Sequence, residues 1–160
     1  MVAGMPTPEP AIPAPAVPAP NDAVRTVVRI ARMLEHVCTE LTLPQYRLLA
    51  MVARGDHRVS HLAGRLALSK PTVTAVVEGL VERGLLARSE VAADRRAVQL
   101  TLTGAGRTAL DSTEAAMVDR LQDLLSRCDD PSLAMAGLAQ LSTALESVLV
   151  EKMAEGARRA

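Results

Sequence analysis

The chain of 160 residues is long enough for one domain with a hydrophobic core, and Tyr46 as its only aromatic residue leaves that core to aliphatic side chains. The formal net charge is zero, no uninterrupted apolar run approaches the about 20 residues that cross a bilayer, and the distant Cys38 and Cys128 indicate neither a zinc site nor a disulfide scaffold. We therefore expect a soluble, mainly helical protein of the reducing cytoplasm, with no cofactor and no membrane contact.

Residues 1–20 hold most of the ten prolines and predict a disordered or polyproline arm. The arm lacks the basic start and apolar middle of a secretory signal. It is either a simple extension or a ligand for a domain that recognises proline-rich segments.

Two helices are expected next. Residues 21–41 repeat apolar side chains at helical spacing, and either Asn21 or Asp22 can cap this helix. Thr42 caps a second, shorter helix, which Gly55 ends.

Two further helices, joined by a tight turn, are expected at 60–66 and 70–83, with Ser60 and Ser69 as caps. The second helix repeats apolar residues at i, i+3, i+4, i+7 and i+8, so one face must be buried. Its other face is small, polar and cationic near the N-terminus, which suits a helix that enters a DNA major groove. That face holds Lys70, Thr72, Thr74, Ala75 and Glu78. The segment is either a helix-turn-helix or an ordinary amphipathic hairpin.

A β-hairpin is expected after Gly84, from the strand-like stretches LLARSEV and AVQLTLT. Its tip at 92–96 carries Asp94, Arg95 and Arg96. Asp94 and Arg96 lie on the same side of an extended chain, so the carboxylate can brace the guanidinium. Directly after a helix-turn-helix, such a hairpin is a wing whose arginines can reach the minor groove or the DNA backbone. Taken alone, it is a solvated polar tip.

Two long helical patterns close the chain, the first capped by Thr103 and broken by Asp129, Asp130 and Pro131. Their apolar stripes, together with that of residues 21–41, exceed what a domain of about 70 residues can cover. They pack either with a second copy of the chain or within one chain as a small bundle. The amount of apolar surface favours the second copy.

Over roughly residues 22–152 the sequence resembles the MarR family of bacterial winged-helix regulators. The resemblance is carried by LTLPQYRLLAMV, by HLAGRLALSKPTVTAVVEGLVERGLLAR and above all by DRRAVQLTLTGAG. It implies a mainly α fold with a small β-wing: a winged helix-turn-helix domain over 42–103 plus N- and C-terminal dimerisation helices over 21–41 and 104–154. It also implies a homodimer on a palindromic operator of double-stranded DNA, with ligands or oxidants that loosen binding and most often relieve repression.

The resemblance also assigns the DNA contacts. The expected DNA-binding residues are Ser69, Lys70, Thr72, Thr74, Ala75, Arg88, Asp94, Arg95 and Arg96. The first five lie on the recognition helix, Arg88 is a strand residue that supports the wing or touches backbone, and the last three form the wing motif. The chain departs from the family at Ala75, where many relatives have a polar or basic residue, and at 91–93, where a proline-containing turn is frequent. These departures concern base specificity rather than the binding mode.

Many relatives bind phenolic or other aromatic compounds in a cleft between the DNA-binding lobe and the dimer helices. Here Tyr46, His36 and His57 would be the polar contacts of such a small-molecule effector, in a mostly aliphatic cleft. Some relatives instead sense peroxides through a cysteine near the first helix. Cys38 lies at the far end of that helix on its apolar stripe, with no cation to lower its pKa, which favours an inert packing role.

The sequence thus predicts a dimeric, sequence-specific DNA-binding regulator, and the resemblance makes it a repressor relieved by a small ligand or oxidant. The alternative is a winged-helix module that binds protein through acidic residues such as Glu78 and Glu82. An enzyme is not expected, because there is no nucleophile elbow, phosphate-binding glycine loop or cluster of metal ligands. His57 and His61 share a helical spacing of four but lack an acidic or Cys partner, so no metal is expected either.

Overall fold

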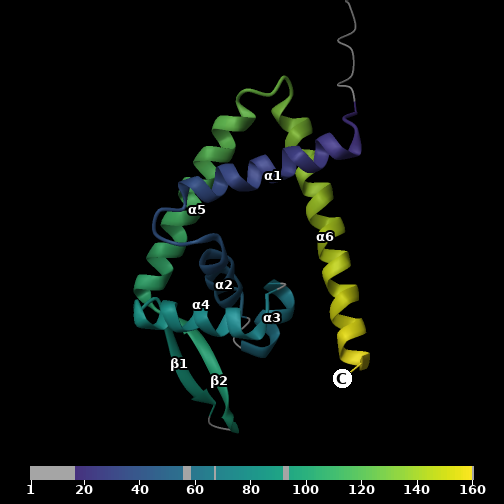
Figure 1. Ribbon diagram of the computed structural model, residues 1–160. Helices are drawn as coiled ribbons and strands as arrows, with labels where there is room; N and C mark the ends of the chain where they lie inside the picture. Colours follow the sequence, from purple (N-terminus) through teal and green to yellow (C-terminus); the bar gives the residue numbers. More distant parts are fainter. Residues whose placement is uncertain (1–16, 56–58, 67, 92–93, 160) are drawn as a thin grey trace, which may run out of the picture.

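The structure, a computed structural model, describes residues 17–55, 59–91 except 67, and 94–159 (Figure 1). Its elements in chain order are α1 (Pro20–Val37), α2 (Leu43–Ala53), α3 (Val59–Leu66), α4 (Lys70–Glu82), β1 (Leu86–Val91), β2 (Asp94–Leu102), α5 (Gly104–Leu125) and α6 (Pro131–Arg159). The expected mainly helical fold with a small antiparallel wing is confirmed. The predicted proline-rich arm lies almost entirely outside the described residues.

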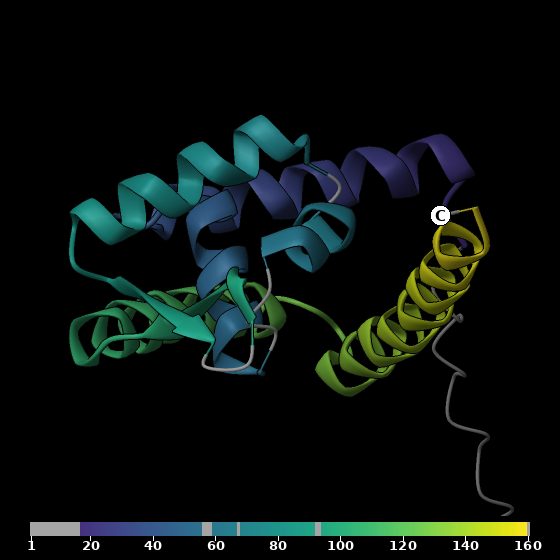
Figure 2. The ribbon, with the colours of Figure 1, turned by 90° about the horizontal axis from the view of Figure 1, so that it is seen from below.

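One aliphatic core holds the helix-turn-helix and the hairpin together. Helix α2 lies at its centre and contacts α3, α4, α5 and β2. Figure 2 shows α4 on one side of α2 and α5 on the other. The most deeply buried side chains are leucines and valines: Leu41, Leu48, Leu49, Leu62, Leu66, Val73, Val77, Leu80 and Leu100. Fully burying each contributes about 1.5–3 kcal/mol, so this small core needs no aromatic residue.

Three hydroxyl caps fix where helices begin, as the sequence predicted for Thr42, Ser69 and Thr103. The Thr42 side chain accepts from the backbone N–H of Gln45, whose side chain accepts in return from the N–H of Thr42. Ser69 and Thr103 accept in the same way from the N–H groups three residues further on. Each such cap stabilises a helix by roughly 1 kcal/mol.

The first helix is shorter than predicted. It ends at Val37 rather than near residue 41, and Cys38 leaves helical geometry with ψ 85°. Helical spacing had placed Leu41 on the apolar stripe of this helix. Leu41 is instead 1% exposed in the core described above, so the chain must leave α1 early to bring that side chain inward.

The hairpin tip also differs from its prediction. Strand β2 already begins at Asp94, so the predicted tip at 92–96 was too long, and Asp94–Arg96 belong to a strand. Glu90 pairs with Val98 but its neighbour Val91 pairs with Asp94, which is an irregularity in the ladder. A bulge of this kind adds twist near the end of a hairpin. Alternation could not reveal it, because alternation assumes a regular register.

Because Gly106 has no side chain, the start of α5 can pack closely against the turn that follows α4. A Cβ atom on Gly106 would collide with the backbone carbonyl of Leu85, and it would lie 3.3 Å from Leu102 Cδ1. Beside it, the Thr103 hydroxyl lies 2.7 Å from the carbonyl oxygen of Gly84, to which it donates. Gly84 has a positive φ of 68°, which glycine adopts without steric cost. Helix α4, the wing and α5 therefore meet at one tight junction.

Helices α1, α5 and α6 extend beyond this core. Helix α1 packs against α5, and Figure 1 shows α5 and α6 diverging from a shared loop with α1 crossing between them. The exposed large apolar side chains of this region are Val24, Val27, Val28, Val118, Leu133, Met135, Leu138, Leu141, Leu145, Val148 and Val150. A single described chain therefore leaves long apolar helix faces in water.

Helix α6 bears on the expectation that the chain has no membrane span. Its segment Pro131–Lys152 is long and apolar enough to cross a membrane by length and composition, with a mean hydropathy of 1.5 and none of it buried. The sequence reading counted only uninterrupted apolar residues and so missed it. A single helix of this kind is weak evidence for a span. Its leucines at 138, 141 and 145 recur at three- and four-residue intervals, the spacing of a helix-packing stripe.

Candidate nucleic-acid interface

The first turn of α4 presents small polar side chains and one cation to solvent. Ser69 is the N-cap, Lys70 is the first helical residue, and both are exposed, as are Thr72, Thr74 and Ala75. On the other side of the helix, Val73, Val77 and Leu80 are buried, which fixes the direction in which the exposed face points. The structure thus brings the five predicted recognition-helix residues together on one surface.

The hydroxyl groups on this surface are already engaged with the helix. Ser69 Oγ lies 2.7 Å from Thr72 Oγ1 and accepts from the Thr72 N–H, while Thr74 Oγ1 donates to the Lys70 carbonyl at 3.0 Å. These contacts restrict the side-chain rotamers before any ligand arrives. A hydroxyl that donates inward keeps its lone pairs for an outside donor, so Thr74 can accept from a base or water without breaking its present bond.

The backbone adds a positive field at the same place. The first N–H groups of a helix have no partners within the helix, and the helix dipole places partial positive charge at that end. Together with the Lys70 ammonium, the turn is suited to a phosphate or another anion. Its exposed first turn is not covered by any other described element.

The wing lies at the same end of the molecule as α4, opposite the α5–α6 loop (Figure 1). Arg88 is exposed on β1, where it pairs across the sheet with Leu100. Ser89 and Thr101 donate to carbonyls of the opposite strand at 3.5 and 3.4 Å. The backbone of Asp94, Arg95 and Arg96 belongs to β2. Their side chains lie outside what the structure describes, so the predicted brace between Asp94 and Arg96 remains a prediction.

The two described effector contacts, His36 and Tyr46, lie in different surroundings. His36 lines a surface hollow of about 580 Å³ between α1 and α5, together with Arg29, Arg32, Met33, Val37 and Arg120. Tyr46 lies elsewhere, on α2, where its hydroxyl donates to Glu114 of α5 at 3.3 Å. Burial and the negative charge of Glu114 raise the pKa of Tyr46. His57 lies outside the described residues.

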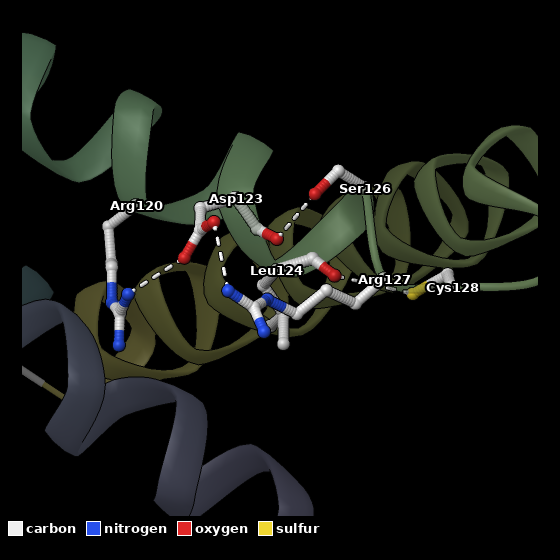
Figure 3. A network of polar contacts seen from close by, with 6 residues as sticks. All are labelled: Arg120, Asp123, Leu124, Ser126, Arg127 and Cys128. Atoms are coloured by element: carbon white, nitrogen blue, oxygen red, sulfur yellow. Dashed lines mark hydrogen bonds and ion pairs between the residues drawn. The ribbon is translucent and has the colours of Figure 1, made fainter.

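The hollow is lined by cationic side chains, which the sequence analysis did not predict. Arg29, Arg32 and His36 come from α1, and Arg120 joins them from α5. Arg120 is held by Asp123 at 2.8 Å, and Asp123 also pairs with Arg127 at 3.4 Å (Figure 3). The α1 residues recur at intervals of three and four, a signal that was present in the sequence. Nothing in the sequence alone brings Arg120 to them.

The two cysteines differ in environment. Burial, followed by the charge of Glu35, raises the pKa of the half-buried Cys38, whose thiol donates to the Leu34 carbonyl at 3.2 Å. A raised pKa lowers the thiolate fraction and hence the reactivity toward oxidants. Cys128 is exposed after α5. Among the described residues, no cluster of His, Cys, Asp or Glu could hold a metal ion.

Comparisons with known proteins agree with this geometry. Residues 39–97 match the model of the MarR family. Those residues run from the linker after α1 to the wing, and thus include the whole surface described above. No curated protein matches the chain.

Solved structures of similar fold cover most of the chain. The transcriptional repressor CouR bound to a 23-mer DNA duplex is 25% identical, with a TM-score of 0.68 over 78% of this chain and 89% of that one. The MarR family transcription regulator SP03579 is 17% identical, with a TM-score of 0.67 over 88% and 91%. BpsR of Bordetella bronchiseptica, whose DNA binding is regulated by 6-hydroxynicotinic acid, is 24% identical, with a TM-score of 0.61 over 77% and 91%.

Proposed function

We propose that this chain, a MarR-family winged-helix transcriptional regulator by its match over residues 39–97 and by its fold, acts in the cytoplasm as a homodimeric repressor at a palindromic operator. The observation that carries the proposal is the first turn of α4. This turn is exposed and cationic, and hydrogen bonds restrict its side-chain rotamers. The buried valine and leucine side chains on the other side of α4 fix the direction in which the turn points.

Each recognition helix would enter the major groove of one half-site. Ser69, Lys70, Thr72, Thr74 and Ala75 would face the bases and phosphates there. The wing residues Arg88, Asp94, Arg95 and Arg96 would lie along the adjacent backbone and minor groove. Phosphate contacts would supply most of the affinity, and the α4 face would supply the specificity.

Dimerisation would cover the apolar helix faces outside the core. The supporting observation is that α6 has no buried residue over its described helical segment, and that α1 adds three valines that are each at least 59% exposed. Exposed patches of this size are rare on soluble monomers. On this proposal, residues 21–41 and 104–154 form the dimer region, 42–103 the DNA-binding domain, and 1–20 an arm.

Control by a small molecule is the last part of the proposal. The hollow that includes His36 lies between α1 and α5, and Tyr46 links α2 to α5 through Glu114. A ligand there, or near Tyr46 and His57, would act on the elements that join the dimer helices to the DNA-binding core. BpsR offers a similar case, since 6-hydroxynicotinic acid regulates its DNA binding.

The test has two parts. Sedimentation should give a dimer, and Leu141→Glu, which places a charge on the α6 stripe, should shift it toward monomer. DNA fragments retained by the purified protein from its host genome should then yield one preferred duplex, bound at least about 10³-fold more tightly than competitor DNA. Retained fragments without a shared sequence, or a wild-type monomer, would overturn the proposal.

The second candidate is a winged-helix module that binds protein instead. It is favoured by Glu78 and Glu82, which are exposed on α4 where phosphates would approach. Such a module would show no preference between promoter duplexes and competitor DNA in a gel shift. The same assay therefore separates the two candidates.

A further inference from the structure

The guanidinium of Arg83 joins the end of α4 to the linker after α1 and to the start of α2, which lie 43 and 38 positions earlier in the sequence. Arg83 follows the last residue of α4, as its C-cap. Its Nη2 donates to the backbone carbonyl of Glu40 at 2.8 Å, and its Nη1 donates to Gln45 Oε1 at 3.3 Å. Two donors on one planar group therefore reach two acceptors at once. The bond to Glu40 is short, as expected of a charged donor.

Gln45 is itself a structural residue. Its side-chain oxygen also accepts from the N–H of Thr42 at 3.0 Å and so completes the capping box of α2. An amide oxygen has two lone pairs, so it can serve Thr42 and Arg83 together. The end of α4 is thus tied to the beginning of α2.

Glu40 lies in the linker between α1 and α2. The linker has no helical backbone from Cys38 to Thr42, and Glu40 is exposed. It is the covalent connection between the helix that carries exposed valines and the helix-turn-helix core. Within the part of the chain that the structure describes, the hydrogen bond from Arg83 to the Glu40 carbonyl joins this linker to α4.

We propose that Arg83 is a positioning residue, which fixes the angle of α4 relative to α1 and thereby the separation of the two recognition helices in a dimer. The inference rests on the proposed function and adds a residue to it. Arg83 acts through the backbone of Glu40 and the side chain of Gln45 and does not itself touch DNA.

The N-terminal turn of α4 lies far from Arg83, so a small tilt at Arg83 moves that turn by a large distance. Helix α4 has 13 residues, so Lys70 lies about 20 Å from Arg83 along the axis. A tilt of about 5° at Arg83 moves the N-terminal turn by about 1.7 Å, by the same geometry. Hydrogen bonds to bases hold only over about 0.5 Å of donor–acceptor distance. If the C-terminal end of α4 were not held in place, the N-terminal turn would therefore not stay within hydrogen-bonding distance of the same bases in the groove.

The test uses three variants of the full-length protein. Arg83→Met removes both hydrogen bonds and the charge, and Arg83→Lys keeps the charge without the two-pronged reach. Arg127→Met is the matched control, because Arg127 is an exposed arginine that follows the end of α5 and pairs with Asp123 (Figure 3). Arg83 and Arg127 are both exposed, so all three variants should fold. Because Arg127 lies within the proposed dimer region, sedimentation checks that each variant is a dimer before its DNA binding is compared.

The readout is the tolerance of half-site spacing. The probes are the duplex that the wild type retains from its host genome and the same duplex with one base pair inserted or deleted between half-sites. Wild type and Arg127→Met should lose about tenfold or more in affinity for the altered duplexes, since neighbouring half-sites must match the dimer. Arg83→Met and Arg83→Lys should bind the native duplex about three- to tenfold more weakly, because each loses a charged hydrogen bond. Their affinities for the native and the altered duplexes should differ by less than about threefold.

The outcomes separate this inference from its rivals. If Arg83 instead contacts a phosphate, Arg83→Met lowers the slope of log affinity against log salt by about 0.9 for each protomer, or about 1.8 for the dimer. Arg83→Lys would then restore affinity, and that result would show that the positioning role is wrong. Unchanged spacing discrimination in both variants also overturns it. If the wild type retains no preferred duplex, the proposed function itself has failed.

Discussion

Replacing Gly106 by alanine should destabilise the protein through a backbone collision. The added Cβ would overlap the carbonyl carbon and oxygen of Leu85, which cannot rotate away as a side-chain end could. The Leu85 oxygen accepts from the Thr103 N–H at 3.3 Å and contacts the Thr103 hydroxyl at 3.2 Å. Displacing it weakens two hydrogen bonds, and it also shifts a Leu85 side chain that is only 7% exposed.

The magnitude follows from these two parts. Two weakened hydrogen bonds cost about 1 kcal/mol each, and overpacking of a buried junction costs about 1–3 kcal/mol. We expect a loss of roughly 3–5 kcal/mol in the free energy of unfolding. For a chain of this size that lowers the midpoint of thermal unfolding by about 10 °C.

The assay is thermal unfolding followed by circular dichroism, with Gly104→Ala as the matched control. Gly104 lies two residues earlier in α5, and a Cβ there meets nothing within 4 Å. Its substitution should be neutral or slightly stabilising. Both variants need the same protomer concentration, because dimerisation would make the midpoint concentration-dependent. Equal midpoints for the two variants would show that the junction is not as tight as the geometry indicates.

Three further outcomes can be measured. Tyr46 has a raised pKa in the fold, so the unfolded chain loses this proton first and the stability falls as pH rises above about 10; Tyr46→Phe should remove that part of the alkaline loss in urea titrations at pH 8 to 11. Ser69→Ala removes the N-cap of α4 and should cost about 1 kcal/mol in denaturant unfolding while also weakening DNA binding, whereas a drop in neither would deny the cap its role. Arg96→Glu should weaken DNA binding in gel shifts and leave sedimentation as a dimer unchanged; undiminished binding would refute the proposed wing contact.

Local rules predicted some helix starts correctly and others wrongly. The cap predicted at Asn21 or Asp22 was wrong, because α1 begins at Pro20 with Ala19 as its N-cap, and Ser60 lies inside α3 rather than before it. Thr42, Ser69 and Thr103 could be identified as caps because a cap depends on neighbours within three residues. The end of α1 could not be, because it is set by where Leu41 is buried, and that depends on Leu48, Leu62 and other residues far along the chain. The irregular pairing at Glu90 and Val91 has the same character, since register is a property of two strands.

In the candidate site, too, features set by neighbouring residues were predictable and features set by distant residues were not. The exposed face of α4 was predictable, because its periodicity buries Val73, Val77 and Leu80 and leaves the rest outside. Arg83 was not, although it stands at the end of that helix. Its partners lie 38 and 43 positions away, and an arginine at a helix end has no periodic signature. Sequence patterns therefore predicted the exposed face of α4 but not the contact that ties its C-terminal end to the linker after α1. If that face binds DNA as proposed, substitutions at Thr72 or Ala75 should change the base preference and leave the half-site spacing tolerance proposed for Arg83 unchanged, which makes the two roles separable by mutation.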